Sequence, residues 1–348
     1  MQQRVRKAET PAPRLAPEPS SSILKGRRTM VLVINFVDST RCGQTLQSLF
    51  GNAAHPELLR VSIHDQIFEA KGDLTCVDAY CRLVDEINCR RDQIVSTKVD
   101  ASQAAGPTVA RAITEKAIGD EEFCLGLDSH LVFTPKWDEQ LVGNWEVTEN
   151  PNAILTVYPK STELLTDHSK DHQMGVQCLS RIETPDADSM VQYQAVRWVD
   201  KTNTTKPRLM AQFAGGFNFG SDVPNDPFTP MLFYGEEYAR AARLWTWGYD
   251  MYAPSVDVVY HFFETRKKIW DLDWSTSYPI LQRSKRRVRA ILGLPVSSEA
   301  YDHTDIHKYA LGTKRTFVQW QNFSGIDPQA KFANGVAIQF ENCGELTI

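Results

Sequence analysis

The chain has 348 residues, 42% of them hydrophobic, and a formal net charge of −5. This length can bury a large core, as one big α/β domain or two smaller ones. The negative charge argues against a nucleic-acid-binding protein, because such modules are usually basic. The longest apolar runs, such as MVLVINFV at 30–37, have the length of a strand and are too short to span a membrane. We therefore expect neither nucleic acid nor membrane among the partners.

The first 29 residues differ in composition from the rest of the chain. They are rich in Arg, Lys, Pro and Ser and lack the apolar stretch of a secretory signal. We expect a disordered, solvated tail over residues 1–29. Because the sequence has no recognisable signal or anchor, it predicts a cytoplasmic protein. It gives no indication of the oligomeric state.

The cysteines support the same interpretation. The chain has seven, an odd number, and they form no dense framework. Cys76, Cys81 and Cys89 fall within a short stretch, but their spacing is not that of a structural zinc site. We predict reduced thiols.

Strand-like and helix-like segments alternate over roughly the first 130 residues, the pattern of a parallel sheet with crossover helices. Apolar runs and alternation predict strands at 57–66 and 123–128 in addition to the first run. Leucines at helical spacing predict a helix at 43–53. Pro107 near the start and Gly119 near the end mark another helix at 106–120.

The second half is richer in predicted strands. Its segments rich in β-branched and aromatic residues lie at 153–159, 191–199, 208–216 and 256–263. A helix is predicted at 235–248. The segment 264–292 is basic and is expected to be helical in part.

An acidic residue and an imidazole follow the strand at 123–128. Residues i and i+2 of an extended strand project to the same face, so Asp128 and His130 can point together beyond the strand's carboxyl end. In open α/β sheets that edge is where ligands bind. An oxygen and an imidazole suit manganese better than magnesium. The alternative is an ordinary surface turn.

The surroundings of this motif resemble those of a known family, the polypeptide α-N-acetylglucosaminyltransferases that modify hydroxyproline on a ubiquitin-ligase adaptor. It is more distantly similar to the polypeptide N-acetylgalactosaminyltransferases. The resemblance extends from about residue 31 to about residue 328 and depends on several motifs in the same order. These are CGQTLQSLFGNAAHPE (42–57), GPTVARAITEKAIGDEEFCLGLDSHLVFTPKWDEQLV (106–142), GGFNFGS (215–221), LFYGEEYARAARLWTWGYDMYAP (232–254), VVYHFFE (258–264) and YALGTKRTFVQWQNFSGID (309–327).

The resemblance implies a GT-A fold, an α/β architecture with a mostly parallel central sheet flanked by helices. It implies a catalytic domain over 30–275 and a C-terminal extension, 276–348, packed on it. It also implies a divalent metal, Mn²⁺, held by Asp128, His130 and His261, and UDP-GlcNAc as the donor. Sequence alone favours a core histidine on an apolar strand for His261, and only the resemblance favours the ligand role.

Further roles follow from the resemblance. The residues expected to bind the donor are Asp38, Gln66, Arg111, Asp128, Gly215 and Gly216. Glu236 and Glu237 are the expected catalytic carboxylates, although an acidic residue at a helix start is favoured by the helix dipole in any case. Trp245, Trp247 and Tyr249 are candidates for an acceptor groove or for core. The basic run 283–289 is a candidate lid over the diphosphate or a solvated face.

One departure from the family concerns the residues after the first strand. The family usually has Tyr-Arg-Asp there, and this chain has Phe36-Val37-Asp38. The basic residue that would make one nucleotide contact of the family is therefore missing, and Val37 stands in its place.

The predicted function is metal-dependent, retaining transfer of GlcNAc from UDP-GlcNAc to a protein hydroxyl, with hydroxyproline of a ubiquitin-ligase adaptor as the acceptor. A metal ion is needed because breaking the anomeric C–O bond leaves negative charge on the diphosphate. The alternatives are another donor or acceptor, such as GalNAc with Ser or Thr, a non-catalytic module that binds a sugar nucleotide, and a hydrolase with a single metal ion. The hydrolase is the weakest alternative, because the sequence contains no clustered histidine motif of the kind that metallohydrolases such as the zincins use.

Overall fold

The computed structural model describes residues 27–182, 187–201, 206–221, 223–264, 268–269, 274–330 and 338–347. Residues 1–26 lie outside this set, so the disordered tail stays a prediction there. Arg27 is buried and pairs with Glu122 and Glu146 at 2.5 Å, just before the first strand. Arg27, which lies within the predicted tail, therefore belongs to the described fold.

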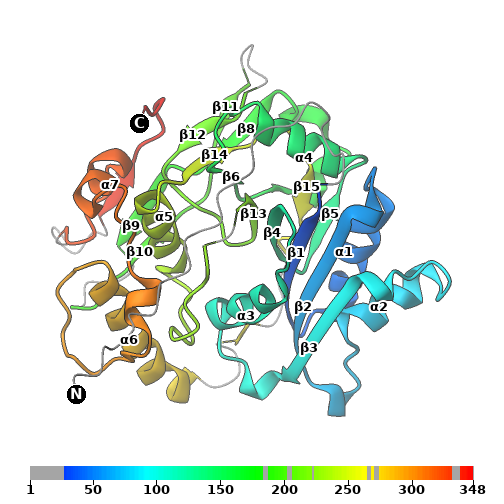
Figure 1. The fold of residues 1–348 in the computed structure, drawn as a ribbon, viewed down its shortest axis with the longest axis horizontal. Coiled ribbons are helices and arrows are strands. Elements are labelled where there is room, and N and C mark those ends of the chain that lie inside the picture. The colour runs from blue at the N-terminus through cyan, green and yellow to red at the C-terminus, as the bar shows by residue number, and fades with distance from the viewer. Residues whose placement is uncertain are drawn as a thin grey trace, which may run out of the picture.

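An eight-stranded sheet forms the centre of the molecule (Figure 1). Its strands, in spatial order, are β12 (Arg208–Met210), β14 (Asp250–Ala253), β6 (Ala153–Thr156), β13 (Phe217–Gly220), β4 (Phe123–Asp128), β1 (Thr29–Phe36), β2 (Leu59–Ile67) and β3 (Ile94–Asp100). The neighbours from β4 to β3 are all parallel, whereas β13 is antiparallel to both β4 and β6. The predicted parallel sheet of the first half is confirmed.

Three small sheets surround the central one. They are β5 (Leu131–Phe133), β15 (Val259–His261) and β7 (Lys160–Ser161); β10 (Val191–Tyr193), β9 (Leu179–Ile182) and β16 (Gln339–Glu341); and β11 (Arg197–Asp200) with β8 (Gln173–Val176). The first of them continues directly from the carboxyl end of β4. The strand predicted at 191–199 is thus two strands, β10 and β11.

Seven α-helices complete the described fold. They are α1 (Ser39–Gly51), α2 (Cys76–Val84), α3 (Pro107–Thr114), α4 (Trp137–Glu146), α5 (Glu236–Thr246), α6 (Trp274–Ile291) and α7 (Phe317–Ser324). In Figure 1, α1 and α2 lie on the side of β1 and β2, and α5, α6 and α7 lie on the opposite side of the molecule. None of the described helices combines the length and apolar character needed to cross a membrane.

The apolar side chains form two separate cores. The first joins α1, α2 and α4 to β1, β2 and β4, and the second joins α5, α6 and α7 to β8, β10 and β14. Residues from the predicted C-terminal extension, including the fully buried Trp320, belong to the second core. The domain boundary at 275 stays a prediction, but the segment after it packs on α5 and the strands around it.

The prediction of reduced thiols is wrong. Disulfides join Cys42 to Cys76, Cys81 to Cys89 and Cys178 to Cys343. The seventh cysteine, Cys124, belongs to none of these pairs. Each pair is formed by segments that the fold brings together, and two of the pairs are far apart in sequence, so spacing alone could not indicate them.

The basic run 283–289 is neither a lid nor a solvated face, because most of it is buried within α6. Arg287 has no exposed surface and donates to both carboxylate oxygens of Asp226, at 2.8 and 3.1 Å. Arg289 donates to the carbonyl oxygens of Pro295 and Ser189, at 2.7 Å each. These cations hold α6 against neighbouring segments.

Candidate active site

Two short strands bring the candidate metal ligands together. Asp128 is the last residue of β4, and β5 begins at Leu131, so Asp128, Ser129 and His130 form the turn between them. β15 pairs antiparallel with β5 and places His261 opposite Leu131. The N–H of Phe262 donates to the carbonyl of His130 at 3.1 Å. The pairing of β5 with β15 thus places His261 beside His130, although 131 positions separate them in the chain.

The three side chains form one cluster. Each offers a ligand atom, and these atoms all lie within 4.8 Å of one another. Nε2 of His261 is 3.6 Å and Nε2 of His130 is 3.9 Å from Oδ2 of Asp128. The two imidazole rings have centroids 4.7 Å apart and are nearly perpendicular. Both histidines are buried, whereas the side chain of Asp128 is 25% exposed.

The charge of Asp128 is stabilised by its neighbours. Burial opposes its ionisation, but the neighbouring His261, His130 and Arg111 hold the pKa of its carboxyl well below the ordinary value. Asp128 is therefore a carboxylate, the form that can bind a cation.

Arg111 connects the cluster to α5. Its guanidinium lies 2.5 Å from Oε1 of Glu236 and 3.3 Å from Oδ1 of Asp128. Burial raises the pKa of Glu236, against the lowering effect of Arg111. One guanidinium is thus shared by two carboxylates.

Glu237 and the two glycines lie beside this bridge. The N–H of Gly215 donates to Oε1 of Glu237 at 2.7 Å, and the hydroxyl of Tyr158 donates to Oε2. Burial raises the pKa of Glu237 to about 7, although both hydrogen bonds lower it. A Cβ atom on Gly216 would lie 2.5 Å from Oδ2 of Asp128, so this backbone approaches the carboxylate as only glycine allows.

The remaining residues predicted to bind the donor follow β1 and β2. Asp38 directly precedes α1, with Oδ2 3.3 Å from Nδ1 of His130, and so borders the cluster. Gln66 is buried near the end of β2, and its amide donates to the carbonyl of Asn35 at 3.5 Å. Sequence analysis missed Thr45 and Tyr158, whose contacts with this site only the fold creates.

The structure contradicts the prediction of an acceptor groove at the end of α5. Trp245 and Tyr249 are 4% and 1% exposed and belong to the second core, where Trp245 packs on Trp320 and Phe323. Trp247 is half-buried against the same core. This end of α5 is opposite to the end that carries Glu236, because the helix runs away from the cluster.

The cluster fits a divalent cation. One carboxylate and two imidazoles form a mixed oxygen and nitrogen set that suits manganese or a similar borderline ion. Nδ1 of His261 is buried and has no hydrogen-bond partner among the described residues. The side chain of Asp128 is partly exposed, so the cluster is accessible from solvent.

Sequence comparison identifies the family. The profile described as glycosyltransferase (GlcNAc) matches residues 72–330, well over half of the chain. The chain belongs to this glycosyltransferase family. The matched residues include Asp128, His130, His261 and Glu236, while Asp38 and Gln66 precede them. No curated protein sequence matches the chain significantly.

Solved structures show the same fold. A crystal structure of GalNAc-T7 with UDP, GalNAc and Mn²⁺ is similar with a TM-score of 0.50 and 13% identity. The match covers 88% of this chain but only 59% of GalNAc-T7, so the chain spans less than two thirds of that protein. The mannosyltransferase PcManGT from Pyrobaculum calidifontis with GDP-Man and Mn²⁺ matches with a TM-score of 0.44 and 11% identity, over 84% of this chain and 72% of that chain. S. aureus TarS 1–349 with UDP-GlcNAc matches with a TM-score of 0.43 and 14% identity, over 80% of this chain and 69% of that chain. The fold is that of the GT-A glycosyltransferases, as predicted.

Proposed function

We propose that the protein transfers GlcNAc from UDP-GlcNAc to a hydroxyl group of a protein, with retention at the anomeric carbon and with Mn²⁺ as the cofactor. The observation that carries this proposal is the cluster of Asp128, His130 and His261 in a chain of a glycosyltransferase (GlcNAc) family. The presence of UDP and Mn²⁺ in the structure of GalNAc-T7, which has the same fold, supports the same donor chemistry.

These three residues would hold the ion, which when bound neutralises charge on the departing diphosphate. Arg111 supports the carboxylate of Asp128 and adds positive charge to the same place. The backbone at Gly215 and Gly216 passes close enough to Arg111 and Asp128 to line the sugar's side of the site. We assign these groups to the diphosphate and sugar end of the donor.

A cleft beside the cluster suits the nucleoside part of the donor. Its volume is about 470 Å³, and its lining comes from the turn after β1, the start of α1, the segment before α2 and α2 itself, including Ser39, Thr40, Asp73 and Arg82. It lies beyond the carboxyl end of β1, the edge where open α/β sheets bind ligands. The buried Gln66 lies at the same edge, at the end of β2.

Glu236 and Glu237 begin α5 on the opposite side of the cluster, and we assign them to the sugar and acceptor side. Glu236 is held by Arg111, and Glu237 by Tyr158 and the N–H of Gly215. Because each carboxylate is already bound by protein groups, neither is a free nucleophile. This supports retention by same-face substitution, in which the leaving phosphate accepts the proton of the acceptor hydroxyl.

The acceptor is either hydroxyproline of a cytoplasmic ubiquitin-ligase adaptor or Ser or Thr of another protein. The three disulfides favour an oxidising compartment over the predicted cytoplasm, because reducing compartments rarely allow such bonds to persist. They therefore favour the second acceptor class. GalNAc is the corresponding second candidate for the donor sugar, because the GalNAc-T7 structure contains that sugar.

The test is UDP release by the full chain with Mn²⁺ and either UDP-GlcNAc or UDP-GalNAc. Peptides containing hydroxyproline, Ser or Thr are compared with matched peptides containing Pro or Ala. We expect release that requires one hydroxyl class and is absent in His130→Ala. If no UDP-sugar and peptide gives release above the His130→Ala variant, the transferase proposal is wrong; binding of the donor without turnover would indicate a binding module.

A further inference from the structure

A single hydroxyl group on α1 holds the turn that carries His130. Thr45 is fully buried, and its Oγ1 accepts a hydrogen bond from the N–H of Leu131 at 2.8 Å. The same oxygen lies within donating distance of the carbonyls of Ser129 and Leu131, at 3.1 and 3.0 Å. These contacts hold the main chain on both sides of His130.

The residue that precedes α1 faces the ring of the same histidine. Oδ2 of Asp38 lies 3.3 Å from Nδ1 of His130 but completes no hydrogen bond among the described residues, so it is a buried acceptor directed at the ring. Oδ1 of Asp38 is held by Arg41 at 2.9 Å. With Nδ1 facing Asp38, Nε2 faces Asp128. A carboxylate on the far nitrogen is the usual way in which proteins orient a histidine ligand.

The backbone that delivers Asp38 is itself unusual. Val37, directly before it, has a φ of 49°, a conformation that is unfavourable for a β-branched residue. Such conformations persist where the surrounding structure requires them and cluster at functional sites. Here the turn at Val37 redirects the chain from β1 so that Asp38 faces His130.

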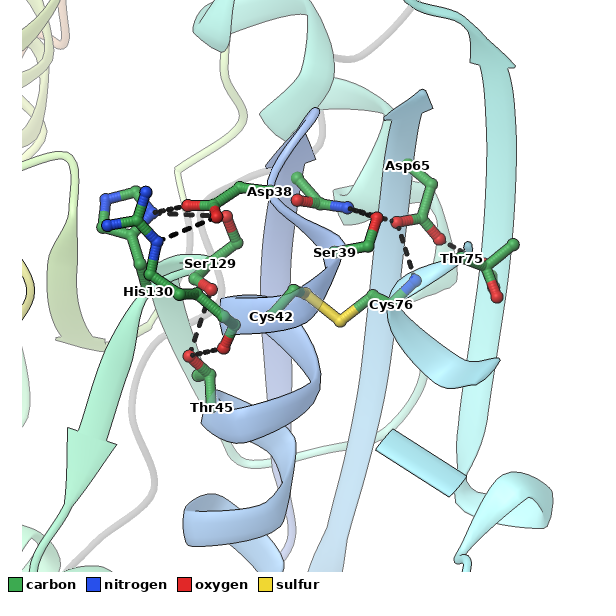
Figure 2. Close-up of a disulfide and its surroundings, with 12 residues drawn as sticks. Asp38, Ser39, Cys42, Thr45, Asp65, Thr75, Cys76, Ser129 and His130 are labelled. Carbon is green, nitrogen blue, oxygen red and sulfur yellow. Dashed lines mark hydrogen bonds and ion pairs between the residues drawn. A yellow bond between two sulfur atoms is a disulfide. The ribbon is translucent and has the colours of Figure 1, made fainter. Parts of the chain in front are cut away.

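The helix α1, which carries Thr45 and follows directly after Asp38, is fixed to its neighbour. Cys42, one turn before Thr45, forms a disulfide with Cys76 at the start of α2 (Figure 2). A Cβ atom on Gly43 would lie 2.8 Å from the backbone of Ala79, so the two helices are in close contact. The N–H of Cys76 also donates to the buried Asp65 at 3.1 Å. A rigid α1 therefore supports the turn.

We propose that Thr45 and Asp38 are positioning residues for the metal ligand His130: Thr45 fixes its main chain and Asp38 its ring. The inference rests on the metal-dependent function proposed above. It replaces direct donor contact as the role of Asp38, because both carboxylate oxygens of Asp38 already face side chains of the protein.

The test measures binding of Mn²⁺ to the full chain in the presence of saturating UDP, by calorimetry and by the paramagnetic resonance signal of the free ion. We expect Thr45→Val, which keeps the shape but removes the hydroxyl, to raise the dissociation constant of Mn²⁺ about tenfold. Thr45→Ser should restore it. Asp38→Asn should also weaken binding about tenfold, and it provides the test if Thr45→Val fails to fold.

The matched control is Ser48, one turn further along α1. Its Oγ accepts a hydrogen bond from the N–H of Phe133 at 3.1 Å, the same kind of contact with β5 but away from His130. Ser48→Ala should lower thermal stability as Thr45→Val does and leave Mn²⁺ binding unchanged.

Two results would overturn the inference. If Thr45→Val and Asp38→Asn bind Mn²⁺ as the wild type does while the wild type is active, the positioning roles are wrong and the proposed function stands. If the wild type itself binds no Mn²⁺, or binds it as well after Asp128→Asn, both the inference and the metal site fall.

Discussion

Two regions of the molecule use buried charges in opposite ways. In the C-terminal region around α6, the guanidinium of Arg287 is matched to one carboxylate, that of Asp226, and also donates to the carbonyl of Asp302 at 2.6 Å. At the candidate active site, Arg111 is shared between Asp128 and Glu236. Figure 1 places α6 and the carboxyl end of β4 in different parts of the structure.

The difference separates a structural ion pair from a binding site. A buried pair with every charge matched holds segments together and offers nothing to a ligand. At the candidate active site two carboxylates share one guanidinium, and the two imidazoles beside them are uncharged when they bind a metal, so the cluster can hold a further positive charge. The same residue types therefore indicate function only when their local charges remain unmatched.

The largest expected effect comes from breaking the matched pair. Arg287→Met leaves the buried Asp226 without its guanidinium and should destabilise the fold by about 3–5 kcal/mol. Turnover per folded molecule should not change, since α6 lies away from the cluster. Denaturant unfolding and UDP release measure the two quantities. The double variant Arg287→Met with Asp226→Leu should recover most of the stability, and loss of turnover in a folded Arg287→Met protein would contradict the separation of the two regions.

A smaller effect is expected at Glu237, which belongs to α5 but contacts the site. Its pKa of about 7 in the folded protein exceeds the ordinary value of 4.5, so folding takes up a proton between these values. Its contribution to stability is therefore fully present below pH 4.5, is lost as the pH rises to about 7, and is constant above that. The loss amounts to at most about 3 kcal/mol.

Glu237→Gln removes this titration. Unfolding free energies measured from about pH 4.5 to about pH 8 should show a stability difference between variant and wild type that shifts in favour of the variant as the pH rises. If the stability difference between Glu237→Gln and the wild type does not depend on pH, Glu237 is ionised throughout this range. It would then resemble the matched charges of the C-terminal region.

The smallest effect distinguishes the two adjacent glycines. A Cβ on Gly216 would press on Oδ2 of Asp128 at 2.5 Å, whereas one on Gly215 would meet the end of the Arg111 side chain at 3.1 Å. Gly216→Ala should weaken Mn²⁺ binding by about 10- to 100-fold, the range for disturbed support of a metal ligand. Gly215→Ala is the matched control and should have a weaker effect, because a long side chain can shift. If both variants weaken Mn²⁺ binding equally, the alanine disturbs the backbone and not Asp128.

Much of the active-site half of the fold can be predicted from sequence because its signals are local. The apolar run before Asp128 and the two-residue step to His130 place both side chains at a strand end, and the structure has them there. Their proximity to His261 could be expected only from the family resemblance. It depends on the pairing of β5 with β15, two strands of three residues each, which no local pattern specifies.

The second half of the chain is harder to predict, because which of its charged and aromatic side chains are buried does not follow from the residue types. The sequence leaves Trp245 open between an acceptor groove and core, and in the structure almost every residue of α5 is buried, including Arg240 and Arg243. The basic run of α6 looked solvated, yet Arg287 is completely enclosed. A charged side chain is buried when a partner from a distant segment reaches it, and sequence alone does not give that partner.

The bond between Cys42 and Cys76 has a practical consequence for anyone who makes this protein. A bacterial host with a reducing interior would deliver both sulfurs as thiols, and the link across 34 positions, which typically stabilises a fold by about 2–4 kcal/mol, would be missing. Inactivity of protein made in such a host would reflect the missing disulfide and would not show which donor sugar the enzyme uses. Material exported to an oxidising compartment, or refolded in air with a thiol exchange buffer, is the preparation on which the assays should be run.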